Sequence, residues 1–451
     1  MTGDLLLGFR VENYRSIHDS TMINLTRSPR NENLSFTRPD VVPALAIFGP
    51  NASGKSNLLG ALRLMFRLVQ FSATSDRSLP FEPFLLGAER GPATTLEIDF
   101  TADGVRYSYE FSFDATRFHT ERLHSWPKGR QRVLFERGHG TSDEYYFGDS
   151  LTGINQALAR ATRDNALFLS TASLLNHETL GPLHQRLIDL VTFVGTDPAV
   201  RLLDETLEAI QGNRALLNRV EGLLRRVDLG VMAIEIEEDE EAQRMKDSAR
   251  QLFESIAPAS GEIAIEFAVG ERTLVPKLRH QGHDGGVTIP FGAESLGTKN
   301  FIALLGPVLH RLATGGVLVV DEMDTSLHPR LMNELVRLFQ DPESNGMQAQ
   351  LVLSTHDVTI MMNSGDYDVL ERDQIWFTSK NPAGETGVRA LASFKDVRSN
   401  EAFSRAYLMD RFGALPRIDR HSLIAFLSQD QIGTIDLLGG GDQHGSDTTA
   451  S

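Results

Sequence analysis

The sequence predicts an α/β fold that combines a mixed sheet, a second antiparallel β-subdomain and a helical insertion. Three observations predict it. Residues 41–49, 315–320 and 348–357 contain aliphatic runs without polar alternation, which is typical of strands buried on both faces of a parallel sheet. Residues 94–113 alternate with period two, as antiparallel strands do. Residues 151–228 are rich in Leu, Ala and Arg at helical spacing.

Composition excludes several classes of protein. Hydrophobic residues make up 41% of the 451 positions, which is enough for packed cores and argues against a mostly disordered chain. The absence of cysteine excludes disulfides, cysteine nucleophiles, iron–sulfur clusters and thiolate zinc sites. The net charge of −16 argues against non-specific coating of nucleic acid, although it leaves a local basic groove open.

No targeting segment is evident. The aliphatic runs are far shorter than the roughly 20 residues that span a bilayer. Residues 1–16 lack both a basic n-region and a small-residue cleavage site, so we expect no signal peptide. A cytoplasmic protein without a membrane partner is therefore expected.

The first 150 residues read as one lobe that is largely β. Residues 4–25 predict two short strands with a turn near Arg15, and Asp103-Gly104 predicts a tight hairpin turn. Residues 121–137 indicate a further pair of strands. The spacing of Leu58, Leu62 and Met65 predicts a helix after the strand at 41–49.

The remaining chain divides into three parts. Residues 151–260 are expected to be a helical insertion, in which the acidic run 235–241 reads as a solvated helix start or loop before a further helix. Residues 261–420 form the second lobe, and 421–451 are an extension that ends in a flexible tail. Within 261–420 we expect strands at 262–269, 274–280, 315–320 and 348–357, helices at 295–313 and 329–340, and edge strands at 372–380 and 387–393.

Residues 49–56, GPNASGKS, match the pattern G-x-x-x-x-G-K-[ST] between a buried strand and an amphipathic helix. Gly49 and Gly54 allow the chain to turn closely around a phosphate. Amide hydrogens and the helix N-terminus surround the β-phosphate, and Lys55 adds a point charge. Ser56 is predicted to bind Mg²⁺. The predicted nucleotide contacts are Gly49, Pro50, Asn51, Ala52, Ser53, Gly54, Lys55, Ser56 and Asn57.

Two adjacent acids follow the second aliphatic strand, in GGVLVVDEMD at 315–324. Asp321 suits a metal-holding role, and Glu322 suits a general base or orienter of the attacking water. His356, at the end of the third aliphatic strand, is predicted to reach the γ-phosphate and the water. Lys55, Glu322 and His356 are therefore the candidate catalytic residues.

A fourth element, ESLGTKN at 294–300, immediately precedes a helix. Ser295, Gly297 and the helix N-terminus offer a second anion-binding surface. This element has no phosphate-loop lysine, so it would complete a nucleotide site rather than found one.

The order of these motifs resembles that of ABC-type ATPases of the SMC, RecF and OLD branch. FRVENYRSI at the start is similar to the N-terminal strand and turn of that branch. More narrowly, the chain resembles AAA-family ATPase subunits of bacterial anti-phage systems such as PARIS, Septu and abortive infection. DNALFLSTASLLNH, RDQIWFTSK and AYLMDRFGALP support that narrower likeness.

The resemblance implies an ATPase that uses ATP and Mg²⁺ and pairs head-to-tail as a homo-oligomer. Each ATP would then meet Ser295, Gly297 and Asp324 of the twin subunit, and Asn13 and Arg15 would contact nucleotide. The signature ESLGT differs from the LSGGQ of transporters but agrees with the branch.

It further implies regulation of a separate effector, a nuclease or toxin, in response to a phage-derived trigger. The residues after His356 contain no aliphatic strand ending in a DxD pair, so no nuclease is expected within them. Two alternatives remain open: a RecF-like repair ATPase that clamps DNA, and an assembly platform that binds ATP without hydrolysing it.

Residues 115–137 carry six basic side chains against Glu121 and Glu136, with Trp126 and Phe135 interleaved. Nucleic acid or an acidic partner could bind this segment. An ordinary solvated hairpin is the simpler interpretation and the favoured one.

Overall fold

The computed structural model describes residues 3–27, 40–75, 77–87, 93–138, 145–194, 199–227, 229–238, 274–282, 286–324, 327–361, 367–395 and 403–416, with a few positions besides. Contacts divide the chain into a large unit, 1–415, and a short one, 416–451. Everything below concerns the large unit.

Its strands and helices run in the following order. The strands are β1 (Leu6–Glu12), β2 (Thr21–Asn24), β3 (Ala44–Phe48), β4 (Thr94–Ala102), β5 (Val105–Phe113), β6 (Phe118–Ser125), β7 (Arg132–Arg137), β8 (Tyr145–Phe147), β9 (Val191–Val194), β10 (Val231–Glu238), β11 (Leu274–His280), β12 (Val287–Pro290), β13 (Val317–Val320), β14 (Gln350–Ser354), β15 (Asn363–Ser364), β16 (Tyr367–Asp368), β17 (Ile375–Lys380) and β18 (Thr386–Ala390). The α-helices are α1 (Lys55–Phe71), α2 (Asn155–Ala161), α3 (Phe168–Leu174), α4 (Leu180–Leu190), α5 (Ala199–Gly212), α6 (Arg214–Arg226), α8 (Leu296–Thr314), α9 (Pro329–Gln340) and α10 (Phe403–Leu408).

The main sheet has the strand order β18-β17-β3-β14-β13-β9 and is parallel except at β18. All five residues of β3 are buried, as its unbroken aliphatic sequence predicts. Leu45 and Ile47 pack on one face of the sheet, whereas Ala44, Ala46 and Phe48 pack on the other, in a core that also contains the buried residues of α8 and α9. The strands therefore carry their following loops to one shared edge.

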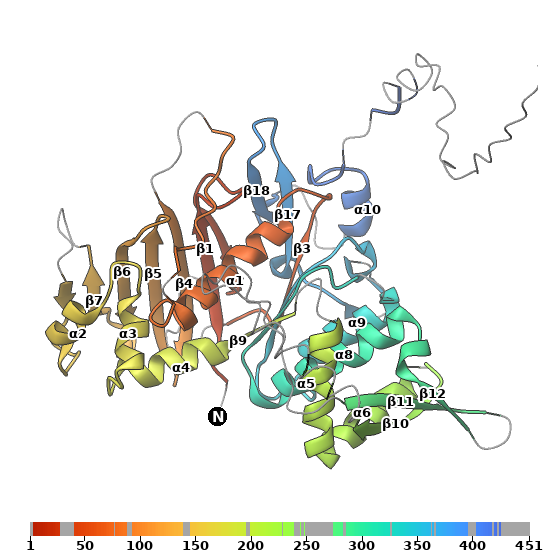
Figure 1. Cartoon of the computed structure of the whole chain (residues 1–451). Coiled ribbons are helices and arrows are strands. Elements are labelled where there is room, and N and C mark those ends of the chain that lie inside the picture. The colour runs from red at the N-terminus through yellow and green to blue at the C-terminus, as the bar shows by residue number, and fades with distance from the viewer. Residues whose placement is uncertain are drawn as a thin grey trace, which may run out of the picture. The chain divides into compact units, whose positions relative to one another are not determined.

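The antiparallel sheet, β2-β1-β4-β5-β6-β7-β8, is the β-subdomain. The β4–β5 turn is Asp103-Gly104, with φ of 51° and 74°, which is the left-handed backbone that the sequence predicts for a two-residue hairpin. Figure 1 shows α1 lying between this sheet and the main sheet. Its buried leucines join both sheets in one core, so the first residues of α1 are held firmly at the sheet edge.

Two expectations about elements are wrong. Residues 191–194, predicted to continue a helix, form β9 and pair in parallel with β13. Three of the four residues are β-branched, and pairing with a buried neighbour outweighs the local periodicity. Segment 372–380 is an interior strand, because β17 pairs with β3 on one side and with β18 on the other.

The acidic run also differs from its prediction, because Glu235–Glu238 lie in β10, which pairs with β11. The other expected strands and helices of the described ranges are present. The predicted strand 262–269, most of the predicted helix after the acidic run, and the predicted flexible tail fall outside the described residues. The division into four domains stays a prediction.

Candidate functional site

The loop between β3 and α1 is shaped for close approach by a ligand. Gly54 precedes α1 with a φ of 108°, and a Cβ atom at this position would lie 2.2 Å from Oγ1 of Thr386. A Cβ atom at Gly49 would lie 2.3 Å from Oγ1 of Thr378. Only glycine meets both the backbone and the space requirements at these positions. Residues 49–54 therefore adopt the tight loop that the sequence pattern predicts, and the loop leads into the N-terminus of α1.

The Lys55 side chain bonds to the backbone of this loop. Its Nζ donates to the carbonyl oxygens of Gly49 at 2.8 Å and Pro50 at 3.2 Å. Burial lowers the pKa of the ammonium, while the charges of Asp321, Glu322 and others oppose that shift. A partly desolvated cation attracts an incoming anion more strongly than a solvated one.

Four hydroxyl side chains and one amide side chain form a hydrogen-bond network that holds the loop in place. Ser53 Oγ lies 2.6 Å from Thr378 Oγ1, and Thr386 Oγ1 donates to the Ser53 carbonyl oxygen at 2.9 Å. Ser16 Oγ lies 2.8 Å from Thr386 Oγ1 and accepts from Asn57 Nδ2 at 2.6 Å. The bracing links the turn after β1, the phosphate loop and the β17–β18 hairpin.

The two adjacent acids are pinned by the end of the neighbouring strand. Ser354 Oγ accepts from the amide of Glu322 at 2.8 Å and donates to a carboxylate oxygen of Asp321. The amide of Met323 donates to the Ser354 carbonyl at 3.0 Å. Glu322 has a φ of 52°, a strained backbone for a residue with a side chain. Parallel pairing of β13 with β14 sets this turn beside the loop after β3.

His356 and Asp324 meet at the same edge. The His356 amide donates to Asp324 Oδ2 at 3.2 Å. Asp324 Oδ1 is buried and has no hydrogen-bond partner among the described residues. Burial and the charge of Lys55 lower the pKa of the His356 imidazole, so it is neutral at neutral pH and free to accept or donate a hydrogen bond.

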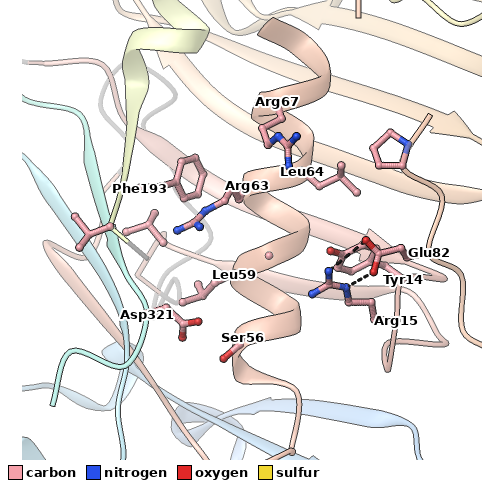
Figure 2. Close-up of a pocket in the computed structure, with 14 residues that line it drawn as sticks. Tyr14, Arg15, Ser56, Leu59, Arg63, Leu64, Arg67, Glu82, Phe193 and Asp321 are labelled. Atoms are coloured by element: carbon pink, nitrogen blue, oxygen red, sulfur yellow. Dashed lines mark hydrogen bonds and ion pairs between the residues drawn. The ribbon is translucent and has the colours of Figure 1, made fainter. Parts of the chain in front are cut away.

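Ser56 and Asp321 both line a cavity of about 310 Å³ beside α1 (Figure 2). Their hydroxyl and carboxylate oxygens are the donors that Mg²⁺ prefers. No group of three or more acidic or histidine side chains with metal-site geometry occurs in the described part of the chain. The donor set therefore fits an ion held by two side chains together with substrate phosphates and water.

Ser295 caps α8, and its Oγ accepts from the Thr298 amide at 3.1 Å. Leu296, the next residue, is 58% exposed. Lys299, one helical turn on, donates to the Gly292 carbonyl. The polar partners of Ser295 belong to its own helix, so the exposed end of α8 is available to a second molecule.

Asn13 and Arg15 lie in the turn after β1, with φ of 54° and 50°. Asn13 is buried, accepts from the Phe84 amide at 3.0 Å and donates to the Ala93 carbonyl at 2.9 Å. Arg15 makes a bidentate ion pair with Glu82. Nucleotide contact by Asn13 and Arg15 stays a prediction.

Sequence reasoning did not identify Ser16, Ser354, Thr378 or Thr386. Ser354 had a usable signal, because it is the hydroxyl at the end of a buried strand in STHD. Thr378 and Thr386 carried none, since each is an ordinary β-branched strand residue.

The basic segment is less charged at its surface than the sequence indicates. Arg137 is buried and donates to the Ala166 carbonyl at 2.8 Å. Glu121 is also buried, and accepts from the amides of Phe168 and Leu169. Arg122 pairs with Glu110. The exposed cations that remain near the β6–β7 turn include Lys128, Arg130 and Arg132.

A phosphate loop after β3 of a buried parallel sheet, together with adjacent acids after β13 of the same sheet, defines a P-loop nucleotide-binding protein. Residues 45–363 match the family described as "AAA domain, putative AbiEii toxin, Type IV TA system". The match covers well over half of the chain, and the chain belongs to this family. The expected AAA-family membership and the P-loop α/β fold with a β-subdomain are thereby confirmed.

Solved structures similar to the chain include two SMC heads. The SMC head domain from Thermotoga maritima matches at 15% identity with a TM-score of 0.41, over 85% of this chain and 98% of that one. An SMC head bound to the C-terminal winged-helix domain of ScpA matches at 13% identity with a TM-score of 0.42, over 89% and 99%. No curated protein matches the chain. Among the described helices, none combines the length and the hydropathy that a membrane span requires.

Proposed function

We propose that the protein binds and hydrolyses ATP between two head-to-tail copies, and that this cycle controls a separate effector in anti-phage defence. The observation that carries the ATPase proposal is the convergence of Lys55 with Asp321 and Glu322 at one sheet edge. Two segments distant in sequence form this arrangement, and each has the chemistry that phosphoryl transfer needs.

In the proposed reaction, the water oxygen bonds to the γ-phosphorus while the bond from that phosphorus to the β–γ bridging oxygen breaks. Glu322 takes a proton from the water, and ADP leaves with the bridging oxygen. Lys55 balances charge on the β- and γ-phosphates, and His356 orients the water or the γ-phosphate. Mg²⁺, held by Ser56 and Asp321, would neutralise phosphate charge.

The head-to-tail pairing rests on the exposed end of α8. Ser295 and Gly297 lie at the N-terminus of α8, whose backbone amides can bind an anion. The apolar side chain of Leu296, between them, is exposed to solvent. A second copy that places this end over the γ-phosphate would supply backbone donors and cover Leu296. Differential affinity of the paired state for ATP would then make pairing depend on nucleotide.

The effector role is supported by the family description, which names a toxin and a type IV toxin–antitoxin system. The effector would be a separate nuclease or toxin, and a phage-derived factor would be the trigger. Pairing and release of heads would change the surface that such a partner contacts.

The test compares Lys55→Ala and Glu322→Gln with the wild-type chain. Lys55→Ala should lower ATP affinity by at least tenfold, because it removes the one cation inside the loop. Glu322→Gln should retain ATP binding, lose at least a hundredfold in turnover and accumulate paired heads. Equilibrium binding, phosphate production and light scattering measure these results. Unchanged turnover in Glu322→Gln would contradict the assignment of the base and favour a platform that does not hydrolyse ATP.

The DNA-clamp alternative is favoured by one observation, the exposed Lys128, Arg130 and Arg132 at the β6–β7 turn. It predicts ATP-dependent, salt-sensitive DNA binding without any partner. Replacing all three residues by Gln should then abolish that binding and leave ATP turnover intact. Absence of DNA binding by the wild-type chain with ATP would exclude this alternative.

A further inference from the structure

The cavity that begins at the predicted metal ligands continues along α1. Ser56, Gly60, Arg63 and Arg67 line it, and they form one stripe of the helix at spacings of three and four residues. Figure 2 shows Arg63 on the side of α1 where Phe193 and Asp321 lie. The cavity therefore leads from the N-terminus of α1 along the helix, away from the phosphate loop.

Two cations that line this cavity, Arg63 and Arg67, are not held in an ion pair among the described residues, and the charge of Asp321 acts on Arg63 without contact. Arg63 and Arg67 make no hydrogen bond or ion pair with the described residues, in contrast to Arg15, which pairs with Glu82 across the same cavity. Burial lowers the pKa of the Arg63 guanidinium, which lies 5.5 Å from the centre of the Phe193 ring. Like charges one helical turn apart repel each other, so a bound anion would stabilise this pair.

Gly60 keeps the middle of the cavity open. A Cβ atom there would lie 3.6 Å from Tyr14 Oη and 3.8 Å from Arg15 Nη1, which are ordinary contact distances. Neighbouring atoms therefore do not require glycine, and glycine weakens a helix interior relative to alanine. The missing side chain has a clear effect on the cavity: it leaves room beside the helix between Ser56 and Arg63.

We propose that this cavity binds inorganic phosphate, the product of ATP hydrolysis, and carries it away from the site. The inference rests on the proposed function, in which a twin subunit covers the γ-phosphate from the other side. Phosphate formed beside Ser56 and Asp321 is attracted by the positive N-terminus of α1. As phosphate moves along the helix, it loses this attraction, and the guanidinium groups of Arg63 and Arg67 bind it instead. The volume of about 310 Å³ far exceeds the share of one water molecule, about 30 Å³, so a hydrated phosphate fits.

A binding experiment tests the site without turnover. The full chain is loaded with ADP and Mg²⁺, and its thermal midpoint is followed as inorganic phosphate is added. Wild type and Arg225→Gln/Arg226→Gln, a control with the same charge change on α6, should both gain stability with phosphate. Arg63→Gln/Arg67→Gln should bind ADP normally and lose that gain. Equal gains in all three would overturn the phosphate site, whereas failure of wild type to bind ADP would overturn the proposed function itself.

A kinetic experiment tests the exit route. ATP cleavage is followed by acid quench, and free phosphate by a fluorescent phosphate-binding reporter. Gly60→Leu, which fills the cavity, should cleave ATP within about twofold of wild type and release phosphate at least tenfold more slowly. Gly60→Ala should match wild type in both. The proposal is overturned if Gly60→Leu releases phosphate at the wild-type rate. It is also overturned if an acidic peptide added to the wild-type chain slows release as much as added phosphate does.

Discussion

At the phosphate loop, two threonines of the β17–β18 hairpin fill the space beside two glycines. Thr378 and Thr386 lie so close to Gly49 and Gly54 that a methyl group on either glycine would collide with them. Their hydroxyls also bond to Ser53, within the loop. The loop geometry is therefore set jointly by its own glycines and by hydroxyls from more than 300 residues away.

Thr386→Val tests this bracing at the scale of a single hydroxyl. The change keeps the shape of the side chain but leaves the Ser53 carbonyl and the Ser16 hydroxyl with one partner fewer. We expect a loss of about 1–3 kcal/mol in the free energy of unfolding. ATP affinity should fall several-fold because the loop relaxes. Urea denaturation and equilibrium nucleotide binding measure the two effects.

Thr386→Ser is the matched control, since it keeps the hydroxyl and removes only a methyl group. It should retain most of the ATP affinity that Thr386→Val loses. If both variants bind ATP like wild type, the hydroxyl bracing has no part in holding the loop.

At the scale of elements, α5 contacts α8 at a position where one backbone hydrogen bond of α8 is missing. Pro307 lies inside the helix and has no N–H to donate to the Ala303 carbonyl. Thr206 of α5 fills that place, donating its hydroxyl to Ala303 at 2.9 Å. Gly306 allows the approach, because a Cβ atom there would lie 2.2 Å from Thr206 Oγ1. The helix that Ser295 caps is thus tied to α5.

A double-mutant cycle isolates this bond. Thr206→Val alone should destabilise the protein by about 1–3 kcal/mol, since the Ala303 carbonyl becomes a buried acceptor without a donor. In a Pro307→Ala background the helix regains its own N–H donor, so the same change should cost at least about 1 kcal/mol less. Chemical denaturation of the four proteins gives the coupling. Additive effects would show that Thr206 contributes by packing alone.

At the scale of the whole molecule, the proposed pairing places each nucleotide between the phosphate loop of one subunit and the α8 end of its twin. Two such sites related by a twofold axis have a consequence that no monomer shares. Variants defective on opposite sides of the interface can form one intact site when they are mixed.

Lys55→Ala and Ser295→Arg provide that test. Each alone should have little ATPase activity, because the first lacks the phosphate-binding cation and the second blocks the α8 end with bulk. An equal mixture should recover about a quarter of the wild-type rate, since about half of random dimers are mixed and each has one intact site. Lys55→Ala mixed with Lys55→Ala/Ser295→Arg is the control and should recover nothing. Failure of the first mixture to exceed its components would contradict head-to-tail pairing.

The sequence by itself determined the parts of this protein that depend on neighbouring residues. The phosphate loop, the buried strands β3, β13 and β14, and the Asp103-Gly104 turn each carry their signal within a few positions. Glycine at a left-handed backbone, alternation on a half-buried strand and aliphatic runs in a parallel sheet are local physical requirements. These elements and their attached site residues were therefore predictable.

Only the tertiary structure decided which distant groups complete the site. β9 became a strand because β13 offered it a pairing edge, against its helical surroundings. Ser354, Thr386 and Arg63 gained their positions from strands and helices that meet only after folding. Hydrogen bonds and cavities depend on distances in space, and residues hundreds of positions apart along the chain give no local signal that they will meet.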